Sequence, residues 1–475
     1  MIRLASDRNW PFGRYHRQIC SATAGFELLQ TTKLGFGLRQ SNSSPTRQDG
    51  IELMSAEFSD FASTVTIEGA FEVLAIAKRL QAQGKNVIEL EIGDSPFPTS
   101  PAATLAGIAA IEEDRCHYGP AVGLREFRQA ASDFVNREYG LHTTFENIVS
   151  GPGAKPFEQF FCEAFLDPGD GVLVFSPHFP TYGPNIARRG ARMVLSRLEQ
   201  ARAFRPDLEN VQRFLTTDPR PKAIFLNSPH NPTGGVTTEE DLRGLADLIR
   251  GKNIAVFSDE PYDRMVWDGR HHTLLEQPEM LDQCLAAYTF SKSYSMSGWR
   301  LGFAVGSSRV IEIVTKLVNS ALSCVPPFTQ IAGIAALRED DAERDRRMAS
   351  FKRKVRLLVD GLHQIDGVRC PPPSGTFYAF PSVAEICNRV GITSHGLAMY
   401  LLEGADARAG VACLGGECFG EAGGGFIRFS CAETDERLRE AIAFVARAFQ
   451  DPDSIRIYLK TRPEHQLSQP YPMHG

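Results

Sequence analysis

The chain has 475 residues, 43% of them hydrophobic and 23% charged, and this composition excludes wholesale disorder and a fibrous or low-complexity chain. Its 51 basic and 57 acidic residues give a formal charge of −6, which argues against nucleic-acid binding because no phosphate-backbone footprint is offered. The apolar runs are short, such as VLVF at 172–175, so that no membrane span of about 20 apolar residues is expected.

The cysteines and histidines give no sign of a disulfide framework or a metal site. The ten cysteines contain no CxxC pair and the eleven histidines show no ligand spacing. This pattern is typical of reduced thiols, and we expect a cytoplasmic protein with no bound metal.

The two ends of the chain differ from the rest. Residues 1–47 carry seven basic and two acidic residues, and a linker-like SNSSPTRQDG follows at 41–50. We expect a poorly ordered extension over 1–53, which is either an Arg-rich organelle transit peptide or a non-functional segment, with translation beginning at Met54. The tail over 451–475 is polar and is expected to fray or to lie over the surface.

Between these ends, helical and strand patterns alternate. Apolar residues from Ile67 to Leu80 recur at helical spacing, with Gly84 as the stop, and 123–140 forms a second amphipathic helix closed by Gly140. A short apolar run at 86–94 lies between the two. Six further apolar runs then predict strands, with the helix at 239–252 the clearest element among them: 171–176, 191–196, 222–227, 253–259, 286–292 and 301–306. The alternation predicts an α/β fold in which helices flank a mainly parallel sheet.

The C-terminal part predicts a smaller α+β unit. Apolar residues from Met348 to Leu362 and from Leu438 to Phe449 form two amphipathic helices, and short strands lie between them at 375–380 and 424–430. We therefore expect an extension over 1–53, the N-terminal part of a small domain over 54–97, a large domain over 98–324, the C-terminal part of the small domain over 325–450, and the polar tail over 451–475.

Polar segments follow three of the predicted strands. Because ligands bind at the carboxyl ends of strands in open parallel sheets, Asn231, Asp259, Tyr262 and Lys292 are expected to converge on one crevice. A partly desolvated Lys292 would offer a nucleophilic amine, although a single lysine at the end of a strand is more often structural. A buried Asp259 would need a cationic partner such as a protonated pyridine nitrogen.

Three segments, NSPHNPTGG (227–235), SDEPYDRMVWDG (258–269) and SKSYSMSGWRLGFAVG (291–306), resemble the signature segments of the fold-type-I, pyridoxal-phosphate-dependent aminotransferases of class I and II. Further resembling segments occur in the family's order: 91–99, 117–127, 166–183, 373–380 and 426–433. The resemblance spans Ile67 to Phe449 and is of the aspartate aminotransferase type. It implies a large domain with the sheet of this fold and a small domain built from both ends of the chain.

The resemblance also implies roles for residues around the cofactor ring. Lys292 matches the lysine that forms the Schiff base with pyridoxal phosphate and shuttles the proton between the substrate Cα and the cofactor C4′. Asp259 matches the aspartate that keeps the pyridine nitrogen protonated. Asn231 and Tyr262 match residues that bind the phenolic oxygen, and Phe179 falls where an aromatic ring stacks on the cofactor.

The phosphate and the substrate carboxylate have implied partners as well. The cofactor phosphate is expected at a helix start and its cradle: Gly153, Ala154, Lys155, Thr289, Ser291 and Arg300. Tyr118 matches a tyrosine that reaches the phosphate from the partner subunit, which implies a homodimer with shared active sites. Arg428 matches the arginine that binds the α-carboxylate, with Asn231, the backbone of Gly93 and the Ser374–Gly375 pair beside it.

The implied activity is amino transfer from an L-amino acid to a 2-oxo acid by a ping-pong mechanism. A carbon–sulfur lyase or an enzyme like aminocyclopropane carboxylate synthase is the alternative on the same fold. A regulatory module is disfavoured, because residues 1–60 show no helix-turn-helix pattern. Lys155 lies where a bacterial subgroup of aspartate aminotransferases has a lysine for the distal carboxylate, which would favour aspartate or glutamate; otherwise it contributes only a backbone N–H to the phosphate site.

Overall fold

The computed structural model describes residues 57–65 and 67–473, and Phe58–Gly475 forms one compact unit. The predicted extension over 1–53, with its alternative as a targeting segment, lies outside the described residues. Among the helices of the described part, none combines the length and the apolar character that crossing a membrane requires.

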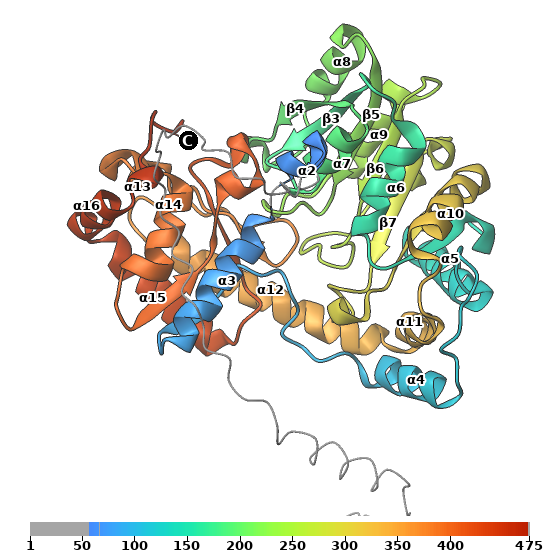
Figure 1. The fold of residues 1–475 in the computed structure, drawn as a ribbon, viewed down its shortest axis with the longest axis horizontal. Coiled ribbons are helices and arrows are strands. Elements are labelled where there is room, and N and C mark those ends of the chain that lie inside the picture. The colour runs from blue at the N-terminus through green and yellow to red at the C-terminus, as the bar shows by residue number, and fades with distance from the viewer. Residues whose placement is uncertain (1–56, 66, 474–475) are drawn as a thin grey trace, which may run out of the picture. The chain divides into compact units, whose positions relative to one another are not determined.

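A seven-stranded sheet forms the centre of the larger part of this unit (Figure 1), with the strand order β2-β8-β7-β6-β5-β3-β4. The strands are β2 (Ile148–Gly151), β3 (Gly171–Ser176), β4 (Arg192–Arg197), β5 (Pro221–Asn227), β6 (Ala255–Asp259), β7 (Cys284–Thr289) and β8 (Gly302–Val305). Only β8 runs against its two neighbours, β7 and β2, among these strands. The predicted α/β fold with a mainly parallel sheet is confirmed.

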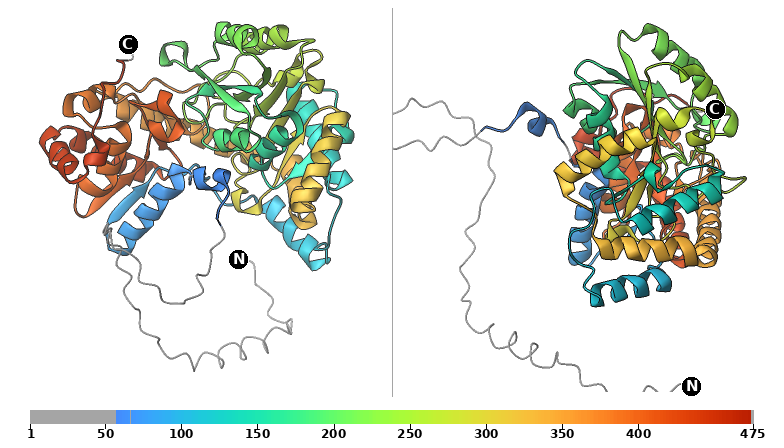
Figure 2. Two further views of the ribbon diagram at one scale, coloured as in Figure 1. Left: turned by 45° about the horizontal axis from the view of Figure 1, so that its top comes forward. Right: turned by 90° about the vertical axis from the view of Figure 1, so that its right-hand side faces the viewer.

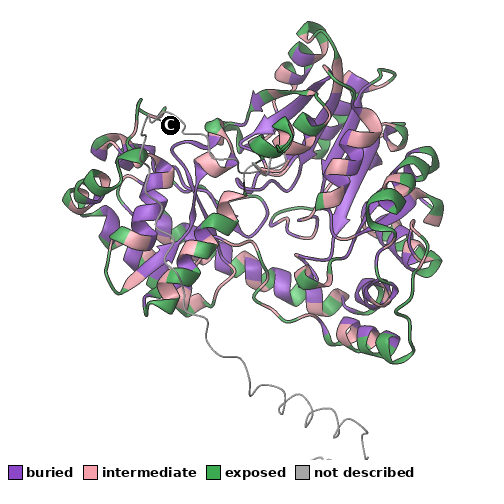
Figure 3. Cartoon of the chain, in the orientation of Figure 1, coloured by how far each residue is buried: buried purple, intermediate pink, exposed green. Residues whose placement is uncertain are grey.

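The sheet is buried on both faces, which explains why its strands are continuous apolar runs. Side chains alternate along each strand, so that Phe225 and Phe257 pack into one hydrophobic cluster while Ile224 and Val256 pack into another. The interior strands are accordingly buried along almost their whole length, whereas the outer faces of the surrounding helices are exposed (Figure 3). The helices of this part are α4 (Pro101–Glu112), α5 (Arg125–Tyr139), α6 (Lys155–Phe165), α7 (Tyr182–Arg188), α8 (Leu208–Thr217), α9 (Glu239–Ile249), α10 (Ser308–Leu322) and α11 (Pro327–Glu339).

Two small sheets bring the two ends of the described chain together. Strand β1 (Asn86–Glu89) pairs in parallel with β10 (Ala409–Ala412), and β11 (Leu414–Gly415), β12 (Ile427–Ser430) and β9 (Tyr378–Ala379) form an antiparallel sheet. The blue helix α3 (Gly69–Ala82) lies among the orange and red C-terminal elements in both Figure 1 and the left view of Figure 2. The other helices are α2 (Asp60–Thr64), α12 (Asp341–His363), α13 (Ala384–Val390), α14 (Ser394–Met399), α15 (Asp435–Phe449) and α16 (Pro452–Thr461).

The tail after Phe449 lies against the protein over its described length, which is the second of its two expected behaviours. Asp451 caps α16 by accepting a hydrogen bond from the Ser454 N–H. Ile455 is fully buried, and the Tyr471 N–H donates to Asn388 Oδ1 at 2.8 Å. The segment 451–475 is polar on average, but the few apolar side chains in it, such as Ile455 and Tyr458, are buried and hold it on the protein.

The first predicted helix differs from its prediction in the face that it buries. α3 begins at Gly69, so Ile67 precedes it, and only Val73 and Ala77 of the helix are buried. Phe71 is 53% exposed and lines the cavity described below. The helical spacing of apolar residues therefore includes positions that belong to a binding site as well as positions of the core. The second predicted helix, α5, does end at Gly140, which takes the left-handed conformation expected of a helix stop.

Candidate active site

A cavity of about 410 Å³ lies at the carboxyl ends of the parallel strands. Strands β2, β3, β5, β6 and β7 each lead into a segment that lines it, and the segments after β1 and on β12 close it from the smaller part of the fold. The predicted cofactor and substrate residues line this cavity, with the exceptions of Tyr118 and the Ser374–Gly375 pair: Gly93, Gly153, Ala154, Lys155, Phe179, Asn231, Asp259, Tyr262, Thr289, Ser291, Lys292, Arg300 and Arg428. Residues spread over more than 300 positions of sequence thus meet at one place.

Asp259 is the last residue of β6 and is buried. The Tyr182 hydroxyl donates to Asp259 Oδ2 at 2.6 Å, and Asn227 Nδ2 donates to the Asp259 carbonyl oxygen at 2.8 Å. Burial raises the pKa of the Asp259 carboxyl to about 6 even though the Tyr182 hydrogen bond acts in the opposite direction. A carboxyl in this state gains from a cationic partner in the cavity.

A second buried carboxyl, Glu158 on α6, lines the same cavity. It accepts hydrogen bonds from Thr181 Oγ1 at 2.5 Å and from Asn185 Nδ2 at 3.1 Å. Burial, followed by the nearby Asp259 charge, raises the pKa of Glu158 well above its usual range. Glu158 therefore holds the start of α7, the helix that carries Tyr182, through Thr181 and Asn185.

Lys292 lies three residues beyond the end of β7 at Thr289, rather than on the strand as predicted. Its Nζ donates to the Gly93 carbonyl oxygen at 2.5 Å and lies 5.9 Å from the centre of the Tyr262 ring. A Cβ at Gly93 would lie 1.9 Å from the Tyr378 hydroxyl, so this position accepts no larger residue without displacing Tyr378. The amine thus faces the cavity from the large sheet, against backbone supplied by the segment after β1.

Arg428 on β12 is buried. Its Nη1 donates to Asn231 Oδ1 at 2.9 Å, its Nη2 donates to the Glu91 carbonyl oxygen, and its guanidinium lies 4.3 Å over the Tyr378 ring. The stacked ring and the Asn231 amide fix the plane of the guanidinium, which is the geometry for bidentate recognition of a carboxylate.

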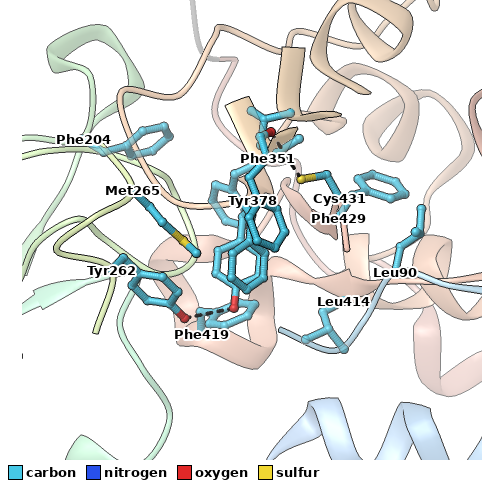
Figure 4. Packing of buried hydrophobic residues seen from close by; sticks show 14 of the residues in the cluster. Leu90, Phe204, Tyr262, Met265, Phe351, Tyr378, Leu414, Phe419, Phe429 and Cys431 are labelled. Atoms are coloured by element: carbon cyan, nitrogen blue, oxygen red, sulfur yellow. Dashed lines mark hydrogen bonds between the residues drawn. The ribbon is translucent and has the colours of Figure 1, made fainter. Parts of the chain in front are cut away.

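Tyr378 lines the cavity, although the sequence pattern assigns it no role. Its hydroxyl and that of Tyr262 are 2.9 Å apart (Figure 4). Ser374 and Gly375, which were expected beside the substrate, do not line the cavity; the Ser374 carbonyl accepts from the Trp267 N–H, and the Gly375 N–H donates to the Gly234 carbonyl at 2.9 Å. Tyr378 is therefore the residue of the segment 373–380 that lines the cavity.

The start of α6 forms an anion-binding corner. Gly153 has φ +93°, and a Cβ there would lie 3.0 Å from Arg300 Nη2, so that glycine permits the arginine to come close. The Gly153 N–H donates to the Gly151 carbonyl at 2.9 Å, whereas the first N–H groups of a helix have no partner within it. Thr289 Oγ1 and Ser291 Oγ, 2.9 Å apart, add hydroxyl groups. A helix N-terminus, a guanidinium and hydroxyls together suit a phosphate.

Lys155, the first residue of α6, is paired within the protein. Its Nζ forms an ion pair with Glu68 and lies 5.1 Å from the centre of the Phe179 ring. Glu68 also lines the cavity and was not predicted. Tyr118 is 91% exposed and does not line the cavity of its own chain.

These groups fit pyridoxal phosphate by their chemistry. Asp259 would hold the protonated ring nitrogen, Lys292 offers an amine for the aldehyde, and the α6 corner offers an anion site for the phosphate. Arg428 remains for the carboxylate of an amino-acid substrate. The buried Asp259 carboxyl on the cavity wall and the close approach of Arg300 that Gly153 allows both suit a bound ligand.

Comparison with known proteins agrees with the chemistry of the site. The family model for aminotransferase class I and II matches residues 85–445. The aspartate aminotransferase of Pyrococcus horikoshii is 31% identical over 370 residues, which are 77% of this chain and 91% of that protein. The solved structure of Thermus thermophilus aspartate aminotransferase with maleate has a TM-score of 0.77 and 29% identity, and the match covers 83% of this chain and all of that one.

An alanine aminotransferase from Pyrococcus furiosus is similar to the same extent in fold, with a TM-score of 0.76 at 27% identity over 83% of this chain and 100% of that one. The relatives are aminotransferases, so the carbon–sulfur lyase alternative is not favoured. Enzymes of this family depend on pyridoxal phosphate, and the cavity has the groups that bind it. The chain belongs to the class I and II aminotransferase family and is a pyridoxal-phosphate-dependent aminotransferase.

Proposed function

We propose that the protein transfers an amino group from an L-amino acid to a 2-oxo acid by a ping-pong mechanism, and that each group of cavity residues has a separate role in it. Bound pyridoxal phosphate supplies an aldehyde for the amino group and a ring that withdraws electrons from the substrate Cα. Lys292 is the group that holds the cofactor and moves the proton between Cα and C4′. The observation that carries this proposal is the Lys292 amine and the buried Asp259 carboxyl on one cavity that also has an anion corner.

Asp259 keeps the ring nitrogen protonated in this proposal. Tyr182 and Asn227 hold the Asp259 carboxylate and backbone by hydrogen bonds of 2.6 and 2.8 Å. Asn231 and Tyr262 bind the phenolic oxygen, and Phe179 covers one face of the ring. Gly153, Ala154, Lys155, Thr289, Ser291 and Arg300 hold the phosphate.

Arg428 binds the α-carboxylate of either substrate. Its Nη1 bond to Asn231 at 2.9 Å links the carboxylate site to the phenolic-oxygen site. The backbone of Gly93 lies beside both Lys292 and this site.

The proposal predicts a half-reaction without acceptor. Holoenzyme mixed with an amino donor alone should convert its cofactor to the amine form, read from cofactor absorption, with one 2-oxo acid formed per site and no free ammonia. Adding a 2-oxo acid should restore the starting spectrum. Release of ammonia in step with the oxo acid would identify an elimination reaction and contradict amino transfer.

We also propose that the enzyme is a homodimer in which Tyr118 contributes to the partner's phosphate site. Tyr118 is exposed in its own chain, and the outer face of α4 carries exposed Leu105, Ile108 and Ile111. Their spacing places them on one helix face, and an apolar patch of this kind suits an interface with a second copy.

Shared sites predict complementation between two impaired variants. Tyr118→Ala should weaken cofactor binding about 10- to 100-fold through loss of a charge-assisted hydrogen bond, and Lys292→Ala should be inactive. Co-expressed, the two chains should form mixed dimers with one complete site each. Activity of the mixture above the sum of the separate variants is the expected result; activity equal to that sum would show that each chain completes its own site.

We propose a division of the described unit into a large domain over 98–324 and a small domain built from 54–97 and 325–450. The pairing of β1 with β10 supports this division. Lys292 and Asp259 then belong to the large domain, whereas Gly93 and Arg428 belong to the small one. A substrate that bridges Arg428 and Lys292 would favour closure of the small domain. Slower hydrogen exchange of the backbone amides of 86–93 with bound maleate is the expected sign of this closure.

A cytoplasmic location is the last part of the proposal. The nine described cysteines are all unpaired, as is typical of a reducing compartment. Recovery of the chain in the cytosolic fraction of cells is the expected result, and recovery in an organelle fraction would contradict it.

A further inference from the structure

One ion pair on the cavity wall has no role in the scheme above. Lys155 Nζ is paired with the Glu68 carboxylate, and both residues line the cavity. The Glu68 side chain is 18% exposed and that of Lys155 is 43% exposed, so the pair lies at the mouth of the cavity, with its acidic member the more enclosed of the two. The cofactor roles use the backbone of Lys155 and leave its ammonium group to be explained.

The Glu68 carboxylate is directed away from its own helix and toward Lys155. Glu68 is the N-cap residue of α3, yet its side chain makes no capping hydrogen bond. Ser, Thr, Asp and Asn usually cap the free N–H groups at this position, and glutamate usually does not. Here the carboxylate is directed to Lys155 instead, and the ammonium is held on a second side by the Phe179 ring.

The charges of the cavity wall point the same way. Four basic residues line the cavity among the described residues: Lys155, Lys292, Arg300 and Arg428. Lys292, Arg300 and Arg428 are taken by the cofactor aldehyde, the phosphate and the α-carboxylate. Lys155 is then the remaining base, and its ammonium group is already paired with Glu68. A distal carboxylate on the substrate would therefore meet no surplus positive charge.

Apolar side chains from the segments of Glu68 and Asp94 also line the cavity. Ala70, Phe71 and Ile92 line the cavity close in sequence to Glu68 and Asp94, and Phe71 presents an exposed aromatic ring at 53% exposure. An uncharged side chain can bury area against this ring, whereas a carboxylate would have to displace Glu68 from Lys155 to find a partner.

We propose that Glu68 neutralises the positive charge of Lys155 by pairing with it, and that the enzyme therefore prefers amino donors with uncharged side chains. This inference rests on the proposed amino-transfer function and names its substrate class. It replaces the expectation of an acidic donor that Lys155 alone suggested, because that expectation required a lysine free of any partner in the protein. Without Glu68, Lys155 becomes a site for a distal carboxylate.

The test compares four holoenzymes in the half-reaction without acceptor: wild type, Glu68→Gln, Lys155→Met, and the double variant. Glu68→Gln keeps the size of the side chain and removes its charge. The ratio of rate to dissociation constant is measured for alanine and for aspartate in single-turnover experiments. Glu72→Gln is the matched control, because it removes a negative charge from an exposed residue of the same helix that does not line this cavity.

Wild type should prefer alanine. Glu68→Gln should raise the value for aspartate by about tenfold or more, as expected for a newly available charged hydrogen bond at a partly exposed site. The ratio for alanine should change by less than about twofold, because alanine has no distal carboxylate to bind Lys155 and its reaction steps do not involve Glu68. Lys155→Met in the Glu68→Gln background should remove the gain, and Glu72→Gln should resemble wild type.

Two outcomes would overturn the inference. One is a wild-type preference for aspartate that Lys155→Met abolishes, which would mean that Lys155 leaves Glu68 to bind the substrate. The other is an equal change for aspartate and alanine in Glu68→Gln, which would assign the ion pair to the support of α6 rather than to selectivity.

A binding measurement separates failure of this inference from failure of the proposed function. Maleate carries two carboxylates and propionate one, and neither can transfer an amino group. Calorimetry should show maleate binding to Glu68→Gln holoenzyme about tenfold tighter than to wild type, with propionate unchanged. Unchanged maleate affinity would refute the role of Glu68 even if no donor reacted with any variant; absence of amino transfer with every donor would refute only the proposed function.

Discussion

Replacing Lys292 by alanine is expected to reduce kcat by about 10²–10⁴-fold or more, the usual loss when a catalytic base is removed. The alanine variant has no amine to hold the cofactor aldehyde or to move the Cα proton. The anion corner at α6 and the Asp259 carboxyl do not depend on the amine, so the variant should still bind cofactor, which its absorption after gel filtration measures.

A folding defect must be distinguished from a lost amine in this experiment. Lys292 donates a single hydrogen bond, to the Gly93 carbonyl at 2.5 Å, so the thermal midpoint of the variant should stay close to that of wild type. A small primary amine added to the buffer should restore part of the turnover, which a misfolded protein could not show. Turnover near the wild-type rate in Lys292→Ala would exclude this lysine as the catalytic one.

The second large effect is expected for Asp259→Asn. The amide keeps the shape of the side chain and can remain beside Tyr182, but it carries no charge to stabilise a protonated ring nitrogen. Cofactor should still bind, while removal of the Cα proton slows by about 10²-fold or more, since a buried charge at this place acts in a low-dielectric site. The measurement is the single-turnover rate of donor deuterated at Cα against that of the undeuterated donor. A change confined to KM with kcat intact would contradict this role.

The same variant makes a prediction about pH and stability. Burial raises the pKa of folded Asp259 to about 6, above the value near 4 of an unfolded aspartate, so the folded state holds the proton more tightly. The resulting contribution to folding is present in full below about pH 4 and is lost as the pH rises through 6. Cofactor-free Asp259→Asn lacks this loss, so it should unfold at the same or a higher temperature than cofactor-free wild type at pH 8. A clearly lower midpoint at pH 8, but not at pH 4, would contradict a raised pKa of Asp259.

The large sheet was predictable because its strands obey a simple rule. Side chains on both faces are buried, so β3, β5, β6 and β7 stand out as continuous apolar runs between helices. Element ends were harder to predict: the apolar run 286–292 continues past the last sheet hydrogen bonds at Thr289. α16 was missed because Ile455 and Tyr458 are buried against a domain that the sequence pattern of the tail alone does not reveal.

The site was predictable where a residue lies at the end of a strand or in a family segment. Lys292, Asp259 and Arg428 are of this kind, and the cavity brings them together. Tyr182 and Tyr378 lie in segments that were recognised, but tyrosines in such segments are as often core residues, and only the hydrogen bonds to Asp259 and Tyr262 distinguish them. Glu68 carries no local signal at all, because it meets Lys155 from 87 residues away.

The most direct test of the central claim asks which lysine holds the cofactor. Two lysines, Lys155 and Lys292, line the cavity among the described residues. Wild-type holoenzyme is treated with borohydride to make the link between lysine and cofactor permanent, digested, and examined by mass spectrometry. The account predicts the cofactor on the peptide that contains Lys292, with none recovered there after prior conversion to the amine form by a donor. Cofactor on the Lys155 peptide, or on a lysine outside the cavity, would contradict it.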